Sequence, residues 1–199
     1  MLFKNYLEKV LGSKVKIGVV RSLLKFPDKS FTARELAGFT KVSHTPVLKS
    51  LKDLLEMGLI DIEKHGTSNL IKLNKNSYLY GPLRELFNYE ANTRKKLVSK
   101  IKEIIVDAEM VILFGSVQKG NEKMNSDIDI LIVTKNRQKI YKEIEEKQNS
   151  VMREFGNVLS PIILTKKQFI NKKNKPFARD LIKNYGLIKG NDLIKTYWK

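Results

Sequence analysis

Apolar residues in the first part of the chain recur at helical spacing. Val15, Val19 and Leu23 share one helix face, and the helix is expected to end before Pro27 because proline disfavours helix in the residue before it. Thr32-Ala-Arg-Glu35 is a capping box that predicts a second helix through Ala37. Ser43 offers an N-cap for a third helix, which Gly58 is placed to end. The apolar face expected for this third helix consists of Val47, Leu48, Leu51, Leu54 and Leu55.

The pattern then changes to short β-type runs. Residues 59–63 and 70–73 predict two strands, joined by a basic polar hairpin tip at residues 64–69. Apolar residues from Leu83 to Ile105 return to helical spacing and predict one long helix, or two, over residues 83–106.

The last part of the chain mixes both patterns. Apolar runs at residues 109–114, 126–133 and 157–164 predict strands, and an amphipathic helix is expected at residues 138–155. Two short helices follow: Thr165 caps one at residues 166–170, and Gly186 is expected to end the other, at residues 176–183. The sequence therefore predicts an α+β protein.

A turn-rich segment, residues 75–82, is the expected seam between two domains. We expect a first domain over residues 1–81, a linking helix over residues 82–107 and a second domain over residues 108–199 with a mixed sheet flanked by helices.

The order helix, capped helix, helix and hairpin resembles a winged helix-turn-helix domain. Phe31-Thr-Ala-Arg-Glu-Leu-Ala37, Ser43 and Leu51–Ile60 carry this resemblance. It implies that the helix after Ser43 enters the major groove of double-stranded DNA, while the hairpin tip contacts the backbone or the minor groove. The candidate DNA-binding residues are Ser43, His44, Thr45, Lys49, Lys52, Lys64 and His65. The alternative is a fold that mediates protein contacts, with the lysines only solvating a helix face.

The strand at residues 109–114 ends in Gly115-Ser116, and the next strand begins with two carboxylates, Asp127 and Asp129. Side chains alternate along a strand, so these two carboxylates are expected on one face, about 6 to 7 Å apart, where they can share a divalent cation. Gly115 lets the backbone approach a phosphate, and Ser116 can hydrogen-bond phosphate oxygens.

Phe114-Gly-Ser116, Lys119-Gly120 and Ser126-Asp-Ile-Asp129 together resemble the signature of the DNA polymerase beta-like nucleotidyltransferase superfamily, especially its minimal nucleotidyltransferase branch. The resemblance implies that Gly115, Ser116 and Lys119 hold a nucleoside triphosphate. It makes Asp127 and Asp129 the catalytic residues and the ligands of Mg²⁺. The expected cofactor is Mg²⁺ with a nucleoside triphosphate, ATP being the first expectation, and the reaction transfers a nucleoside monophosphate to an acceptor hydroxyl.

One member of that pattern is missing, because the family places a third carboxylate on the next strand and residues 157–164 contain no acid. Ser160 stands about where that carboxylate is expected. Two alternatives therefore stay open. One is a transcriptional regulator whose second domain senses nucleotide or forms a homodimer. The other is an antitoxin-like minimal nucleotidyltransferase with a protein acceptor or a toxin partner.

The amino-acid composition indicates which kinds of partner the protein binds. The chain has 38 Lys and Arg against 21 Asp and Glu, a net charge of +17, which favours polyanions such as nucleic acid or nucleotides. It has no cysteine, which excludes disulfides and thiolate chemistry. The sequence contains no apolar run long enough for a membrane span and no signal-peptide pattern at its start, so we expect a cytoplasmic protein without membrane contact.

Overall fold

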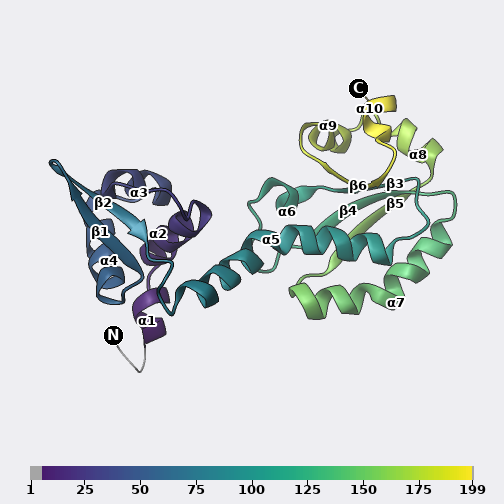
Figure 1. Cartoon of the computed structure of the whole chain (residues 1–199). Helices are drawn as coiled ribbons and strands as arrows, with labels where there is room; N and C mark the ends of the chain where they lie inside the picture. Colours follow the sequence, from purple (N-terminus) through teal and green to yellow (C-terminus); the bar gives the residue numbers. More distant parts are fainter. Residues whose placement is uncertain (1–5, 199) are drawn as a thin grey trace. The chain divides into compact units, whose positions relative to one another are not determined.

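The structure, a computed structural model, describes residues 6–198. The fold is α+β, as predicted. The described chain forms two compact units that meet inside helix α5 (Tyr80–Ile104), between Asn92 and Thr93 (Figure 1). Each unit has buried apolar clusters of its own. Within residues 6–198, no helix combines the length and the apolar character needed to cross a membrane.

From residue 6 to the start of α5, the first unit contains four helices followed by a hairpin; the last three helices and the hairpin come in the predicted order, and the first helix was not predicted. They are α1 (Tyr6–Leu11), α2 (Lys14–Lys25), α3 (Ala33–Thr40), α4 (His44–Glu56), β1 (Ile60–His65) and β2 (Ser68–Leu73). The capping box is present, with the Thr32 hydroxyl accepting from Glu35 N and the Glu35 carboxylate accepting from Thr32 N. Gly58 has a φ of +67° just after the end of α4, the left-handed conformation that the sequence predicted there.

Two local expectations in this unit were wrong, and a third was confirmed only in position. Helix α3 continues to Thr40 rather than ending at Ala37, because the left-handed conformation that stops it comes at Lys41. Ser43 is the N-cap residue of α4, as predicted, but its hydroxyl accepts no capping hydrogen bond. Leu48 and Leu55 are not core residues, since 48% and 44% of their surfaces are exposed. They lie at the edge of the helix face whose centre is buried.

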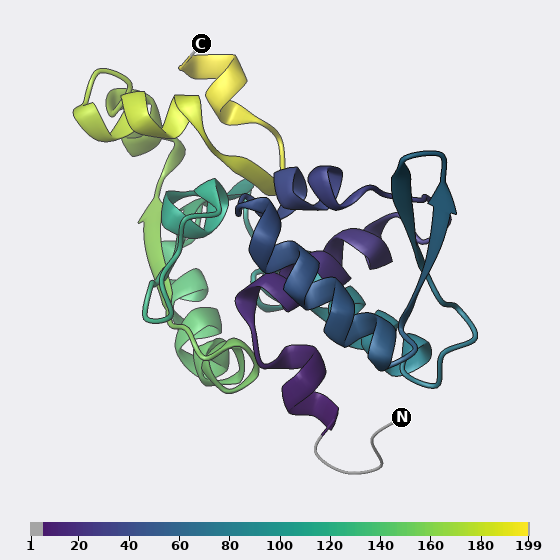
Figure 2. The same cartoon turned by 90° about the vertical axis from the view of Figure 1, so that its left-hand side faces the viewer.

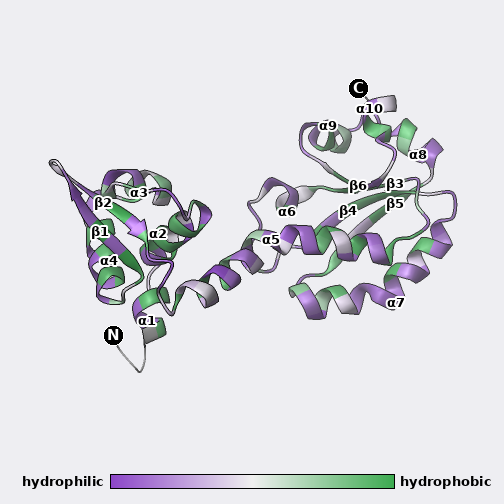
Figure 3. Ribbon diagram, viewed as in Figure 1, coloured by the Kyte–Doolittle hydropathy of each residue, from purple (hydrophilic) through white to green (hydrophobic). Residues whose placement is uncertain are grey.

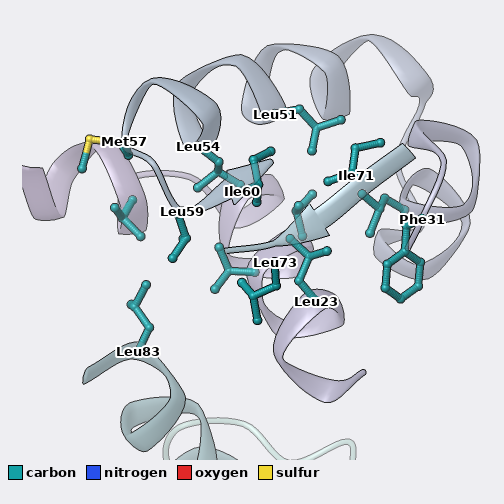
Figure 4. Close-up of a cluster of buried hydrophobic side chains, with 14 of the residues drawn as sticks. Leu23, Phe31, Leu51, Leu54, Met57, Leu59, Ile60, Ile71, Leu73 and Leu83 are labelled. Atoms are coloured by element: carbon teal, nitrogen blue, oxygen red, sulfur yellow. The ribbon is translucent and has the colours of Figure 1, made fainter. Parts of the chain in front are cut away.

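The core of the first unit lies between the helices and the hairpin (Figure 4). Leu23 of α2, Leu54 of α4 and Ile71 of β2 are all fully buried in it. Phe31 joins the hairpin through two backbone hydrogen bonds with Ile71. Leu83 of α5 is also buried in this cluster, so the unit includes the first turns of that helix.

The second unit begins within α5 and is built on a four-stranded sheet. Its other elements are β3 (Met110–Leu113), α6 (Gly115–Lys119), β4 (Ile128–Val133), α7 (Arg137–Phe155), β5 (Leu159–Leu164), α8 (Lys166–Asn171), α9 (Pro176–Lys183), β6 (Gly186–Gly190) and α10 (Leu193–Tyr197). The strand order is β5-β4-β3-β6, with β4 and β5 parallel and the other two pairs antiparallel. The predicted mixed sheet is confirmed.

Alternating side chains of the central strands enter two separate cores. Ile128, Ile130 and Ile132 of β4 pack with α5 and α7, whereas Leu131 and Val133 pack with α8, α9 and α10. Both faces of the sheet are therefore covered by helices, and the sheet strands are correspondingly apolar (Figures 1 and 3).

Three details of the second unit differ from the sequence-based expectations. Strand β4 begins at Ile128, so Asp127 lies just before it and only Asp129 lies within it. Residues 186–190 form an edge strand, which their two apolar residues were too few to predict. Helix α9 does end at Lys183, but Asn184 rather than Gly186 is its C-cap.

Candidate functional site

Gly115 and Asp129 are in direct contact where β3 ends beside β4. Gly115 has a φ of +71°, and a Cβ at this position would lie 1.9 Å from Oδ2 of Asp129. The amide of Phe114 donates to the backbone oxygen of Asp129 over 3.0 Å, which fixes the two chain segments against each other. Only a glycine fits here, because it both tolerates the left-handed backbone and leaves room for the carboxylate.

Ser116 and Lys119 follow on α6, a single short helical segment directly after Gly115. Its position is held by Gln118, whose side-chain oxygen accepts from Arg94 of α5 and whose amide nitrogen donates to Asn184 Oδ1 over 3.3 Å. Ser116 is half-buried and Lys119 is exposed. The sequence predicted the glycine, the serine and the lysine, but nothing in it indicated that Gln118 anchors the segment.

Asp127 stands on the loop that enters β4, and the side chain of Asn157 holds that loop from outside. Asn157 donates through Nδ2 to the backbone oxygens of Met124 and Ser126, over 3.2 and 2.8 Å. Asn157 lies two residues before β5, so the segment that leads into one strand fixes the loop that leads into its neighbour. Asn157 is a positioning residue that the sequence analysis missed, because its role depends on contacts 31 and 33 residues away.

The two carboxylates form an electrostatically unfavourable pair by themselves. Burial raises the pKa of Asp129 above its ordinary value, and the negative charge of Asp127 raises it further. A divalent cation removes both penalties, because it neutralises the charges and replaces the lost solvent with an ionic ligand bond. Carboxylate oxygens are also the hard ligands that Mg²⁺ prefers. The residues present therefore fit a Mg²⁺ ion.

The neighbouring strand brings no third acid to this pair. In the parallel β4–β5 register, Asp129 is directly opposite Ser160. Ile162 and Leu164, which alternate with Ser160, pack on the same face of the sheet as Leu131, so Ser160 and Asp129 share that face. Among residues 6–198, no three acidic or histidine side chains are grouped closely enough to hold a metal ion together.

Comparison with protein families finds one match, which lies in the second unit. Residues 94–188 match the nucleotidyltransferase domain family. The matched segment contains Gly115, Ser116, Lys119, Asp127 and Asp129, and the match supports the expectation of a nucleotidyltransferase domain in this unit. No curated protein is significantly similar to the chain.

Several solved structures resemble parts of the chain at low identity. A possible transcriptional regulator from Methanosarcina mazei Go1 is 16% identical, with a TM-score of 0.35, over 49% of this chain and 86% of that one. A toxin–antitoxin structure with AMP-PNP is 14% identical, with a TM-score of 0.38, over 52% and 79%. TrmBL2, an archaeal chromatin protein, is 16% identical, with a TM-score of 0.30, over 89% and 72%.

In the first unit, all the candidate DNA-binding residues are exposed. Three of them precede or begin α4, two lie further along it, and two lie at the end of β1: Ser43, His44, Thr45, Lys49, Lys52, Lys64 and His65. The hairpin lies beside α4 (Figure 2), and a groove of about 790 Å³ runs between them. His44, Lys52 and Arg34 line this groove, and Arg34 was not among the predicted residues.

Proposed function

We propose that the nucleotidyltransferase domain binds a nucleoside triphosphate with Mg²⁺ and transfers its nucleoside monophosphate to an acceptor hydroxyl. The observation that carries this proposal is the contact between Gly115 and the Asp129 carboxylate, because it joins a phosphate-type turn to a carboxylate pair. In this arrangement Asp127 and Asp129 hold the metal, while Ser116 and Lys119 hold the phosphates. Bound Mg²⁺ would neutralise charge on the phosphates and in the transition state.

The reaction also needs an acceptor for a proton. As the acceptor oxygen forms its bond to the α-phosphorus, the bond to pyrophosphate breaks and the hydroxyl proton must leave. Ser160 occupies the position beside Asp129, and a serine hydroxyl is a poor base at neutral pH. We therefore propose that the acceptor or a partner protein supplies the group that takes the proton.

Calorimetry and label transfer together test this proposal. Mg²⁺ with a triphosphate should bind the full chain, and both Asp127→Asn and Asp129→Asn should weaken binding at least tenfold. Glu122→Gln is the matched control, since Glu122 is an exposed acid on the same loop. With radiolabelled triphosphates and cell extract, label should pass to an acceptor. The absence of both nucleotide binding and label transfer would refute the proposal.

We further propose that residues 1–81 form a winged helix-turn-helix that binds double-stranded DNA, with residues 82–107 as a link to residues 108–199. The exposed basic residues of α4 and the hairpin favour this second function. Lys49→Ala should weaken binding uniformly across DNA sequences and reduce the slope of log K against log salt by about 1. Lys75→Ala is the control, since Lys75 lies just after β2, at the end of the hairpin opposite its tip, and pairs with Asp28. A slope that is unchanged in Lys49→Ala would contradict the proposal.

A further inference from the structure

A small pocket lies between α6 and α9, next to the turn at Gly115. Its volume is about 210 Å³. The residues that line it are Phe114, Gly115, Lys119, Phe177, Asp180, Leu181 and Asn184. We propose that this pocket binds the nucleobase of the triphosphate whose phosphates lie at Ser116. The inference rests on the proposed nucleotide binding and adds to it the part of the molecule that reads the base.

Helix α9 presents one face to this pocket. The lining residues of α9 and its C-cap are spaced by three, four and seven residues, which brings side chains to the same side of a helix. They are Phe177, Asp180, Leu181 and the C-cap residue Asn184. From the other side, the ring of Phe114 meets the ring of Phe177 edge to face, with centroids 5.8 Å apart and planes at 83°. The two rings give the pocket an aromatic wall.

The polar groups of the pocket suit the edge of a base. Gln118 donates to Oδ1 of Asn184, and no hydrogen bond among residues 6–198 uses the two N–H donors of Asn184. These donors are available to ring nitrogens or carbonyl oxygens of a base. The exposed carboxylate of Asp180 accepts from ring N–H or exocyclic amino groups. An aromatic wall with donors and acceptors at its rim is the chemistry that recognises a nucleobase.

Size and position agree with this assignment. At about 210 Å³ the pocket is smaller than the sites of whole drug-sized ligands, so it accommodates a flat ring system rather than an entire nucleotide. Phe114, Phe177 and Leu181 belong to the apolar cluster on the sheet face that also carries Asp129. Base and phosphates would thus bind on one side of the sheet, joined at Gly115.

The test is calorimetry on the full chain with Mg²⁺, using the four common nucleoside triphosphates and inorganic tripolyphosphate as probes. We expect the triphosphates to bind at least tenfold more tightly than tripolyphosphate. Phe177→Leu should weaken all four triphosphates about tenfold and leave tripolyphosphate unchanged, since the aromatic surface is lost while volume is kept. Asp180→Asn should change the ranking among the four bases.

Phe155→Leu is the matched control for the aromatic change, because Phe155 is half-buried in the other core of the same unit and does not line the pocket. It should leave all affinities unchanged. Equal affinity for tripolyphosphate and the triphosphates, or normal nucleotide affinity in Phe177→Leu, would overturn the nucleobase pocket while leaving metal and phosphate binding in place. Failure of every probe to bind would instead overturn the proposed function.

Discussion

Two independent constraints act on residue 115. Its backbone is left-handed, which costs an L-amino acid about 1 to 2 kcal/mol, and its missing side chain makes room for the Asp129 carboxylate. Gly120, at the other end of α6, has the same backbone conformation with φ +70°, but a Cβ there would meet no atom within 4 Å. A side chain at either position would therefore strain the backbone, but only a side chain at residue 115 would also clash with a neighbouring residue.

The first prediction compares alanine substitutions at these two glycines. Gly115→Ala should weaken Mg²⁺-dependent nucleotide binding at least tenfold, because the methyl group displaces the Asp129 carboxylate. Gly120→Ala should cost stability through the same backbone strain and leave nucleotide affinity nearly unchanged. Calorimetry and thermal unfolding of both variants provide the measurements. Similar nucleotide affinities in the two variants would show that the contact with Asp129 is irrelevant to binding.

The second prediction places an acid beside the carboxylates of Asp127 and Asp129. Ser160→Asp places a carboxylate directly opposite Asp129 in the β4–β5 register, where it can act as a base or as a metal ligand. Transfer of labelled nucleotide should rise at least tenfold over the unmodified protein. Ser160→Asn has nearly the same shape without the charge and should not raise transfer. An equal rise with asparagine would rule out a role for the carboxylate.

The sequence offered candidates for the chemistry of the site, but not the residues that hold them in place. Gly115, Asp127 and Asp129 belong to a local motif and could be proposed from the sequence, and their roles stay predictions. Asn157 and Gln118 act through hydrogen bonds to residues 24 to 66 positions away. Such partners depend on strand order and helix placement, which a local pattern does not contain.

At the scale of elements, an ion pair joins α2 to α4 in the first unit. Lys16 Nζ lies 2.5 Å from Asp53 Oδ2, and both side chains are mostly covered. The hydrogen bond from Lys16 holds the pKa of Asp53 below its ordinary value of 3.8. Because the pKa is lower in the folded state, this carboxylate stabilises the fold above about pH 4 and loses that contribution as the pH falls through its folded pKa.

The third prediction follows from the lowered pKa of Asp53 in the folded state. Asp53→Asn should lower the free energy of unfolding by up to about 1 kcal/mol near neutral pH, and the difference from the unmodified protein should disappear in acid. Urea unfolding at several pH values between about 2.5 and 7 measures this difference. Asp61→Asn, at an exposed position of β1, should show no such pH-dependent difference. A difference for Asp53→Asn that persists in acid would exclude the ion pair as its cause.

Elements with a local start or stop signal were predicted well. The capping box at Thr32, the cap at Thr165 and the left-handed Gly58 each mark a helix boundary that the structure confirms. Strand β6 lacks such a signal, because it is an edge strand made by pairing with β3. Leu48 and Leu55 were misplaced because helical spacing gives the direction of a side chain but not the extent of what covers it.

At the scale of the whole molecule, α5 serves both units. Leu83 and Phe87 are buried in the core of the first unit, and Leu97, Ile101 and Ile104 are buried in the second. The sequence predicted the long helix, but its apolar spacing did not tell which residues belong to which core.

The fourth prediction concerns where the first unit ends. A protein truncated after Gly81 lacks Leu83 and Phe87 and should be less stable than one truncated after Asn92 by about 3 to 6 kcal/mol, the value of two buried side chains. The longer fragment also keeps the Arg21–Glu90 pair, which is exposed and adds little. Chemical denaturation of both fragments measures the difference, and equal stabilities would contradict it.

The lack of buried side chains in the middle of α5 affects how well its backbone amides are protected from hydrogen exchange. From residue 88 to residue 96 no side chain is fully buried, so the amides there are protected mainly by the hydrogen bonds of the helix itself. In native-state hydrogen exchange these nine amides should exchange faster than those near Phe87 and Ile101, and a uniform rate along the helix would contradict this. Helix α5 would then be one continuous helix that unfolds as two cooperative parts. Each end would open together with the core in which it is buried.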